Sequence, residues 1–162
     1  MRELLVLPAS GVESECELAY AALQQVLYPL LDRLPELTIS QRRALHTTLG
    51  LDDGFADIYT VALAALKLIV EAAATRPVVV LVDDLHWLDP QSTDVLAFVA
   101  RRIGNEPVFM LGVTRVVSRN DPLRRTGLPE LYLERLDDEA SAALLDMRTP
   151  TLAAPVRARI LA

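Results

Sequence analysis

Two aspartates and an arginine follow two apolar runs of the sequence, at positions from which their side chains could meet. Asp83 and Asp84 come directly after the run Val78–Val82, and Arg115 follows the run Val108–Val113. In open parallel α/β sheets a ligand lies at the carboxyl ends of the strands, so residues that follow neighbouring strands converge on one edge. A pair of carboxylates and an arginine at such an edge suit a phosphate group that carries a magnesium ion.

Each of these side chains has a separate chemical role in that interpretation. Asp83 would hold a hydrated magnesium ion, because Mg²⁺ prefers carboxylate oxygen and keeps several of its waters. Asp84 would polarise an attacking water, and Arg115 would meet the terminal phosphate through its fork of donors. An aspartate after a strand is also a common turn or cap residue, so the run VVVLVDD alone leaves both interpretations open.

The residues that follow the aspartates are interpreted as structural. Asp89 and Pro90 are typical of the N-cap and first residue of a helix, and Trp87 is expected to pack. His86 is interpreted as an oriented loop residue and not as a ligand, because His46 and His86 show no metal-ligand spacing.

Apolar periodicity and helix signals predict the elements that must position these residues. Strands are predicted at Glu3–Pro8, Val78–Val82, Val108–Val113 and Leu131–Leu133. A capping box at Ser14 and Glu17 predicts a helix to about Leu34 that bends at Pro29. Further helices are predicted at Ser40–Leu49, Asp57–Ala74, Pro90–Arg102, Asp137–Met147 and Pro155–Ala162. The alternation of strands and helices predicts an α/β fold with a parallel sheet covered on both faces.

Composition limits the class of protein. The 162 residues suffice for one domain with a sizeable core, and a hydrophobic content of 52% excludes a disordered chain. A net charge of -6 argues against a basic nucleic-acid surface. The single cysteine, Cys16, permits no internal disulfide and fits a reducing cytoplasm. The longest apolar run, Val61–Val70, contains Lys67 and is shorter than the roughly 20 residues of a membrane span. We therefore expect a cytoplasmic protein with no membrane segment.

The segment around the aspartates resembles a known family. VVVLVDDLHWLDPQSTDVLAFVARRI, followed by PVFMLGVTR, is similar to the Walker B and sensor-1 blocks of a STAND-type P-loop ATPase, in particular the AAA-like ATPase domain of large LuxR-type transcriptional regulators. ASGVESECELAYAALQQVLYPLLDRL and LPELYLERLDDEASAALL also resemble that domain, so the similarity extends over nearly the whole chain. It implies ATP and Mg²⁺ as ligands, with Asp83 as the magnesium aspartate, Asp84 at the catalytic-acid position and Arg115 as the sensor.

The same resemblance implies a domain organisation. The fold would be a three-layer P-loop NTPase-like parallel sheet of order 5-1-4-3-2, in which the four predicted strands are strands 2 to 5. Residues 1–135 would form a partial ATPase core, and residues 136–162 would begin the helical region that follows it. Any contact with DNA would be made by a separate domain outside this chain.

One essential part of a P-loop enzyme is missing from the sequence. The signature G-x-x-x-x-G-K-[ST] cradles the phosphates, but the chain contains no Gly-Lys pair, and its only lysine, Lys67, lies within a predicted helix. We therefore expect a fragment without strand 1 and without the P-loop, inactive alone and prone to self-association through the exposed edge of the Val108–Val113 strand.

Two other interpretations remain open at this point. The chain could be a degenerate, non-enzymatic relative that serves as a docking domain, in which case no P-loop signature would precede it in its gene. It could also be a magnesium phosphohydrolase that uses Asp83 and Asp84 without a P-loop, although no nucleophile or further carboxylate is placed suitably for that reaction.

Overall fold

A computed structural model describes residues 3–115 and 126–161. By its internal contacts the chain divides into two compact units, Met1–Leu128 (unit 1) and Pro129–Ala162 (unit 2). The prediction placed the boundary at residue 135, seven residues later. The two units are described separately below.

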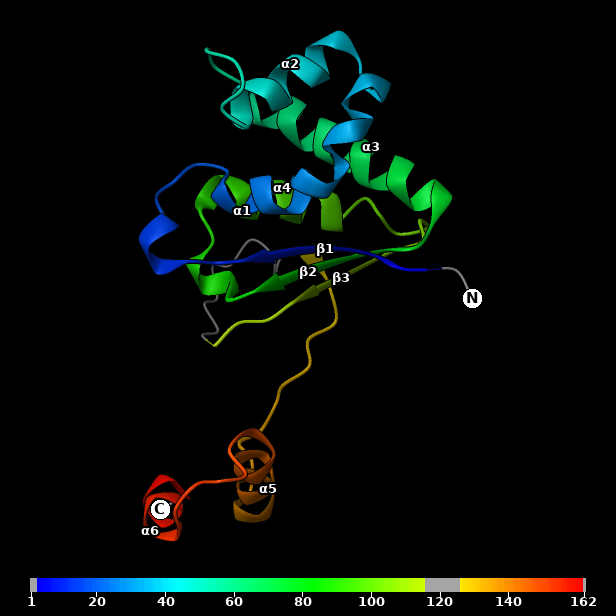
Figure 1. Ribbon diagram of the computed structural model, residues 1–162. Coiled ribbons are helices and arrows are strands. Elements are labelled where there is room, and N and C mark those ends of the chain that lie inside the picture. Colours follow the sequence, from blue (N-terminus) through cyan, green and yellow to red (C-terminus); the bar gives the residue numbers. More distant parts are fainter. Residues whose placement is uncertain (1–2, 116–125, 162) are drawn as a thin grey trace. The chain divides into compact units, whose positions relative to one another are not determined.

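Unit 1 contains a parallel three-stranded sheet, which makes the fold α/β as predicted. Its strands are β1 (Leu5–Ser10), β2 (Val78–Asp83) and β3 (Val108–Gly112), in the spatial order β1-β2-β3 (Figure 1). Val6, Val79 and Phe109 share one register position across the three strands. β1 extends two residues beyond its predicted end, through Pro8. Proline is tolerated there because β1 is an edge strand and a residue that faces away from β2 loses no ladder hydrogen bond.

The predicted strand Leu131–Leu133 is wrong. These residues have no regular structure, and the side chains of Leu131 and Leu133 are 86% and 84% exposed. A short apolar run becomes a strand only where another strand offers its backbone, and the described sheet consists of β1, β2 and β3. Strands 1 and 5 of the order 5-1-4-3-2, which the resemblance implied, therefore have no counterpart in the described structure.

The helices of unit 1 connect the strands. They are η1 (Glu13–Glu15), α1 (Ala21–Leu27), η2 (Tyr28–Glu36), α2 (Ile39–Thr48), α3 (Ile58–Thr75), η3 (Leu85–Trp87) and α4 (Pro90–Ala100), where η denotes a 3₁₀ helix. The predicted bend at Pro29 is the change from α1 to η2. Gly50, with a φ of +71°, ends α2 as expected for a glycine C-cap.

The predicted start of the first helix at Ser14 is wrong. The segment forms only the 3₁₀ turn η1, and α1 begins at Ala21 after Tyr20, whose φ is +65°. The cap of α1 comes from another part of the chain: Asp89 accepts hydrogen bonds from the backbone amides of Tyr20 and Ala22 at 2.8 and 3.2 Å. A partner 67 to 69 residues away leaves no signal in the local sequence.

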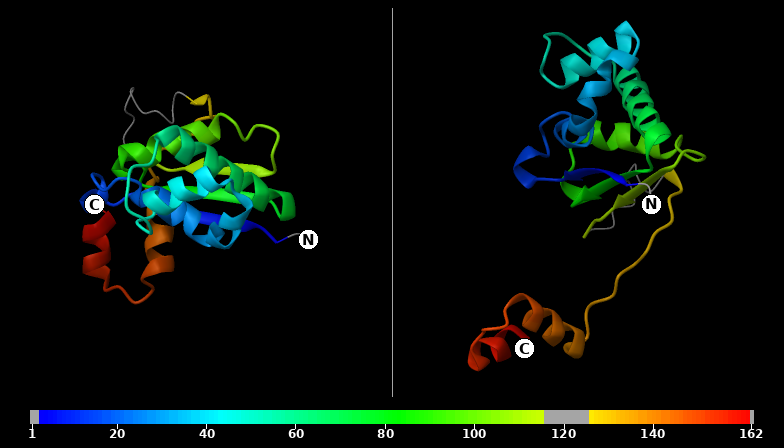
Figure 2. Two further views of the ribbon diagram at one scale, coloured as in Figure 1. Left: turned by 90° about the horizontal axis from the view of Figure 1, so that it is seen from above. Right: turned by 45° about the vertical axis from the view of Figure 1, so that its right-hand side comes forward.

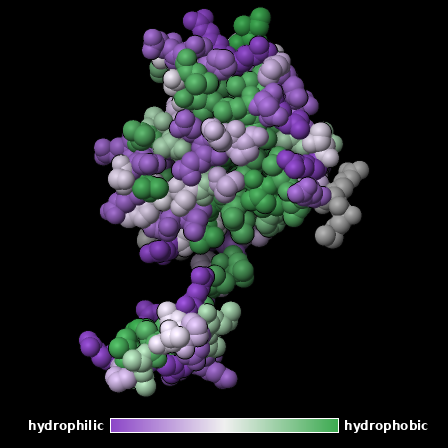
Figure 3. All heavy atoms as spheres, in the orientation of Figure 1, coloured by the Kyte–Doolittle hydropathy of each residue, from purple (hydrophilic) through white to green (hydrophobic). Residues whose placement is uncertain are grey.

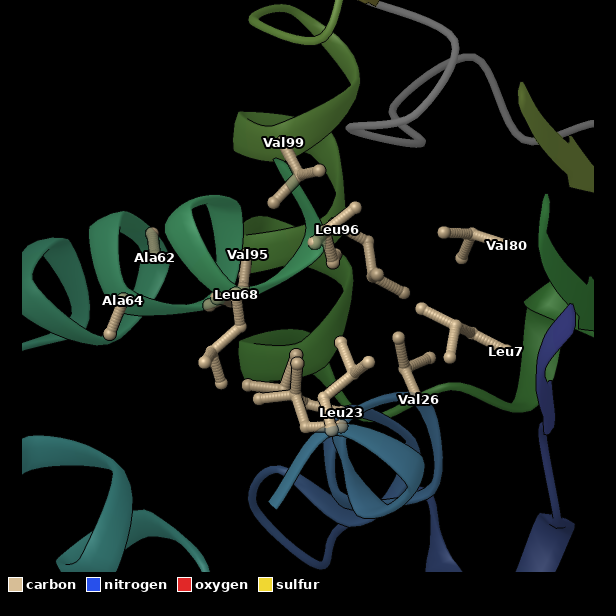
Figure 4. Packing of buried hydrophobic residues seen from close by; sticks show 14 of the residues in the cluster. Leu7, Leu23, Val26, Ala62, Ala64, Leu68, Val80, Val95, Leu96 and Val99 are labelled. Atoms are coloured by element: carbon tan, nitrogen blue, oxygen red, sulfur yellow. The ribbon is translucent and has the colours of Figure 1, made fainter. Parts of the chain in front are cut away.

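One face of the sheet carries the core. Leu7 and Val80 point from β1 and β2 toward Leu23 and Leu96 of α1 and α4, and all four side chains are buried (Figure 4). α3 crosses behind them, and eight of its residues are buried. Its length and composition alone would allow a membrane span, but its packing against α2 and α4 in this core accounts for its apolar sequence.

Among the described residues of unit 1 no helix covers the other face of the sheet (Figure 2), contrary to the expectation of helices on both faces. Figures 1 and 2 show α1 to α4 on a single side of the strands. On the opposite side Val6, Phe109 and Leu111 are 46%, 61% and 45% exposed, and apolar atoms gather over the strands in Figure 3. The reason lies in the strand order. Right-handed crossovers that step in one direction, β1 to β2 to β3, place every connecting helix on the same face.

Unit 2 consists of α5 (Asp138–Arg148) and α6 (Ala154–Leu161). Asp137 caps α5 as predicted, since its carboxylate accepts from the amide of Ala140 at 2.7 Å. The guanidinium of Arg157 joins the helices by donating to both carboxylate oxygens of Asp146 at 2.8 and 2.9 Å. This hydrogen bonding lowers the pKa of Asp146. Neither helix has a buried residue.

Candidate functional site

The residues singled out in the sequence lie at the carboxyl end of the sheet. β1 ends at Ser10, which is in register with Asp83 at the end of β2. β3 ends at Gly112 beside Val82, and the chain continues from there to Arg115. Asp83, Asp84 and Arg115 therefore follow two adjacent parallel strands, as their sequence positions predicted.

Asp83 holds the turn that leaves β2. Its carbonyl accepts from the amide of Gly11 at 2.9 Å, which extends the β1–β2 ladder by one bond. Its carboxylate oxygen Oδ1 accepts from the amide of Asp84 at 2.8 Å. Aspartate commonly bonds nearby backbone amides in this way at turns. Because the side chain is exposed, the second carboxylate oxygen can still bind a cation or a water.

Asp84 adopts a left-handed backbone conformation, with φ 46° and ψ 49°. The conformation turns the chain into η3, where the amide of Trp87 donates to the Asp84 carbonyl at 2.8 Å. Gly11 makes this turn possible, because a Cβ at position 11 would lie 2.3 Å from that carbonyl oxygen and 2.9 Å from the Trp87 backbone. The segment that follows β1 can therefore pack against the aspartate turn only with a glycine at position 11.

The Asp84 carboxylate lies between two nitrogen-bearing side chains. Arg115 Nε is 3.5 Å and His86 Nε2 is 3.8 Å from its Oδ1. Both separations are longer than a well-formed hydrogen bond. The Arg115 side chain is 81% exposed and that of Asp84 is 29% exposed. Such an exposed pair contributes little to stability, so the arrangement leaves both groups available to a ligand.

His86 is more enclosed than its neighbours in the cluster. Its side chain is 17% exposed, and its ring lies 5.2 Å from the Trp87 ring at a tilt of 45°. Its Nδ1 is buried and has no hydrogen-bond partner among the described residues. Within those residues no group of three or more His, Cys, Asp or Glu side chains is arranged to hold a metal ion. The protein could therefore supply one or two carboxylates to a cation at this edge.

Asp89, expected to be only a helix cap, has a larger role. It is 1% exposed and caps α4 by accepting from the amide of Ser92 at 2.8 Å. It also accepts from the amides that begin α1, and Ser92 Oγ accepts from the amide of Leu23 at 2.8 Å. Burial and the charges of Asp57 and Asp89 raise the pKa of Tyr20 at this junction. The strand-end turn is thereby anchored to two helices.

Two other features lie outside the cluster. Lys67 belongs to α3, and its Nζ donates to the carbonyl of Glu36 at 3.0 Å. A surface hollow of about 730 Å³ lies beside α2 and is lined by residues that include Arg43, Phe55 and Asp57. This hollow and the charged groups around Asp84 are in different places. We assign the site to the charged groups, because they converge at the strand ends where parallel α/β sheets bind ligands.

Comparison with curated proteins finds a protein to which part of this chain is similar. The chain is 33% identical over 87 residues to an uncharacterized protein of Rhizobium meliloti (strain 1021); the match covers 53% of this chain and 8% of that protein. The matched segment therefore spans less than a tenth of the relative's length. No protein-family profile matches the chain, and no solved structure matches it.

Proposed function

We propose that this chain is the Walker B and sensor half of an ATP-binding domain that belongs to a large STAND-type regulator of the LuxR class. The observation that carries the proposal is the convergence of Asp83, Asp84 and Arg115 at the carboxyl end of two adjacent parallel strands. This is the edge at which α/β sheets bind ligands. The much greater length of the curated relative is in keeping with a multidomain parent.

The residues present suit a magnesium-bound phosphate. Mg²⁺ is usually held by one or two carboxylates, with waters and phosphate oxygens completing its octahedral shell. Asp83 is exposed and retains a carboxylate oxygen for such a hydrated ion. The bound ion would neutralise charge on the phosphates. Asp84 would orient and polarise water, and Arg115 would donate to the terminal phosphate.

The proposal also implies how firmly ATP is held, where the parent protein acts and how it contacts DNA. ATP would be held firmly only in the intact parent, because no Gly-Lys pair in this sequence supplies the phosphate cradle. The parent would act in the cytoplasm as a switch that depends on ATP binding, and would contact DNA through a separate domain. This chain alone would not hydrolyse ATP.

Calorimetric titration with Mg²⁺-ATP tests the proposal on the chain itself. We expect a dissociation constant in the millimolar range, since the lost cradle removes several charge-assisted hydrogen bonds of about 1.5–3 kcal/mol each. Asp83→Asn should abolish the magnesium-dependent part of this binding, whereas Asp94→Asn, an exposed carboxylate in α4, should leave it unchanged. Equal binding of Mg²⁺-ATP by the two variants would show that Asp83 does not belong to the site. A micromolar dissociation constant would show that the chain binds the nucleotide tightly without a P-loop.

The open sheet face supports a second candidate, a non-enzymatic docking domain. Parallel sheets are almost always covered on both faces, and here Val6, Phe109 and Leu111 are exposed. A docking domain would show no magnesium-dependent nucleotide binding in any variant. Its gene would also carry no in-frame G-x-x-x-x-G-K-[ST] signature upstream of this segment.

A further inference from the structure

The β1 edge of the sheet is protected against pairing with a further strand. The amides of Leu5 and Gly11 donate toward β2, so the even-numbered residues of β1 direct their backbone groups away from the sheet. Among these residues, Pro8 has no N–H. The Gln25 side chain binds both the amide and the carbonyl of Ser10, at 3.0 and 3.1 Å. Proline and occupied backbone groups prevent the addition of another strand at an edge.

The β3 edge lacks this protection in the described part of the chain. The amide of Val113 donates to β2, so the even-numbered residues Val108, Met110 and Gly112 direct their backbone groups outward. Only the Val108 amide is bound locally, by the carbonyl of Glu106. The strand VFMLG contains neither a charged residue nor a proline. Apart from the Val108 amide, its outward backbone groups are donors and acceptors that no proline or charged side chain of the strand blocks.

The side chains of β3 are those of an interior strand. Val108 and Met110 are half-buried against the core, while Phe109 and Leu111 on the open face are 61% and 45% exposed. Apolar residues on both faces are typical of strands in parallel sheets whose two faces are covered. An exposed edge of this composition templates pairing with another chain.

We propose that two copies of this chain associate through β3, antiparallel and with Met110 opposite Met110, so that the two sheets join into one. Identical strands related by a two-fold axis run antiparallel, and residues opposite each other must lie on the same face. Centring the pair on Met110 engages all the outward-facing residues: Met110 bonds its counterpart, and Val108 bonds Gly112. The Met110 pair exchanges two backbone hydrogen bonds. In each Val108–Gly112 pair the Val108 carbonyl accepts from the Gly112 amide, while the Val108 amide keeps its bond to Glu106.

Charge and side-chain pairing favour a second copy over a peptide of another composition. In the centred register Phe109 lies opposite Leu111 on the open face, an apolar pair that stabilises antiparallel strands. β3 contains no charged residue, so the paired strands bring no like charges together. Beyond the strands this register places Glu106 of one copy opposite Thr114 of the other, next to Arg115, so an acidic and a basic residue are near each other at each end.

Matched lysine substitutions at the two edges test which surface is used. Phe109 and Val6 share one register row and one open face but belong to opposite edges, and both are exposed. By sedimentation equilibrium, we expect the wild-type chain to dimerise, Phe109→Lys to raise the dissociation constant by at least about tenfold, and Val6→Lys to change it by less than about threefold. A wild-type monomer at concentrations up to about 100 μM would overturn the proposal. Equal weakening by both substitutions would also overturn it, because it would indicate association through the open face.

Cysteine cross-linking tests the register and remains decisive if Phe109→Lys does not fold. In a Cys16→Ser background, Phe109→Cys mixed with Leu111→Cys should form an intermolecular disulfide under mild oxidation. Opposed residues at a non-hydrogen-bonded position lie about 4.5 Å apart at Cα, within the range that a disulfide spans. Phe109→Cys alone should remain uncross-linked, because position 109 faces position 111. Efficient cross-linking of Phe109→Cys alone, or none in the mixture, would refute the centred pairing.

Discussion

Two groups of aspartates lie within seven consecutive residues of this chain, and their surroundings differ. Asp89 is 1% exposed and accepts hydrogen bonds from three backbone amides, which begin both α1 and α4. Asp83 and Asp84 are accessible, and Asp83 accepts one short hydrogen bond from its neighbour's amide. The carboxylate whose acceptor capacity is filled by the chain has a structural role. The carboxylates that keep accessible oxygens are the ones that can bind a ligand.

Replacing Asp89 with alanine should have the largest effect. The substitution leaves the buried amides of Ala22 and Ser92 and the partly buried amide of Tyr20 without their acceptor. Each unsatisfied buried donor costs about 1–3 kcal/mol. We expect the free energy of unfolding to fall by about 3–5 kcal/mol in a urea titration followed by circular dichroism. Asp94→Ala, an exposed position in the same helix, should change it by less than about 0.5 kcal/mol. A loss below about 1 kcal/mol for Asp89→Ala would show that water replaces its contacts.

Gly11→Ala should have the next largest effect and should act on the aspartate turn. The added Cβ would lie 2.3 Å from the Asp84 carbonyl oxygen, so β1 or the turn must shift. Overpacking of this kind costs about 1–3 kcal/mol. The matched control is Gly104→Ala, where no atom lies within 4 Å of the new Cβ, and there we expect no loss. Equal unfolding midpoints for the two variants would contradict the close contact.

Asp84→Asn should hardly change stability, in contrast to the alanine substitution at Asp89. Its ion pairs with Arg115 and His86 are long and partly exposed, and asparagine tolerates the left-handed conformation of this position. We expect a change below about 0.5 kcal/mol in thermal or urea unfolding. In the intact parent the same substitution should abolish ATP turnover and leave ATP bound. Normal turnover in that variant would refute the role proposed for Asp84.

Asp57 caps a helix but is exposed, so it shows what a capping carboxylate contributes without burial. Its contribution to the free energy of unfolding should be the smallest of the four. It caps α3, and hydrogen bonds from the backbone and side chain of Thr60 lower its pKa from 3.8, but its carboxylate is exposed. A carboxyl group with a lowered pKa stabilises the fold above its unfolded pKa and loses that contribution as the pH falls through its folded pKa. The stability advantage of the wild type over Asp57→Asn should therefore shrink below about pH 4. An advantage that stays constant down to pH 2.5 would exclude this linkage.

Local signals in the sequence predicted the elements whose hydrogen bonds are local. Asp89 and Pro90 begin α4 as expected, α3 begins within one residue of its predicted start at Asp57, and Gly50 follows α2 at a positive φ. At Ser14 the same kind of signal failed. The side chains of a capping box compete with other acceptors for the backbone amides at the start of a helix. Here the buried carboxylate of Asp89 binds the amides of Tyr20 and Ala22, so the helix begins at Ala21.

The sequence by itself determined three parallel strands, the helices between them and the placement of Asp83, Asp84 and Arg115 after adjacent strands. These properties depend on periodicity and on residues that are near one another in the chain. The tertiary structure alone decided that the helices of unit 1 cover one face of the sheet, that Gly11 must pack against the Asp84 carbonyl, and that β1 and β3 differ as edges. Each of these depends on contacts between segments distant in sequence, and a local pattern of residues does not predict such contacts.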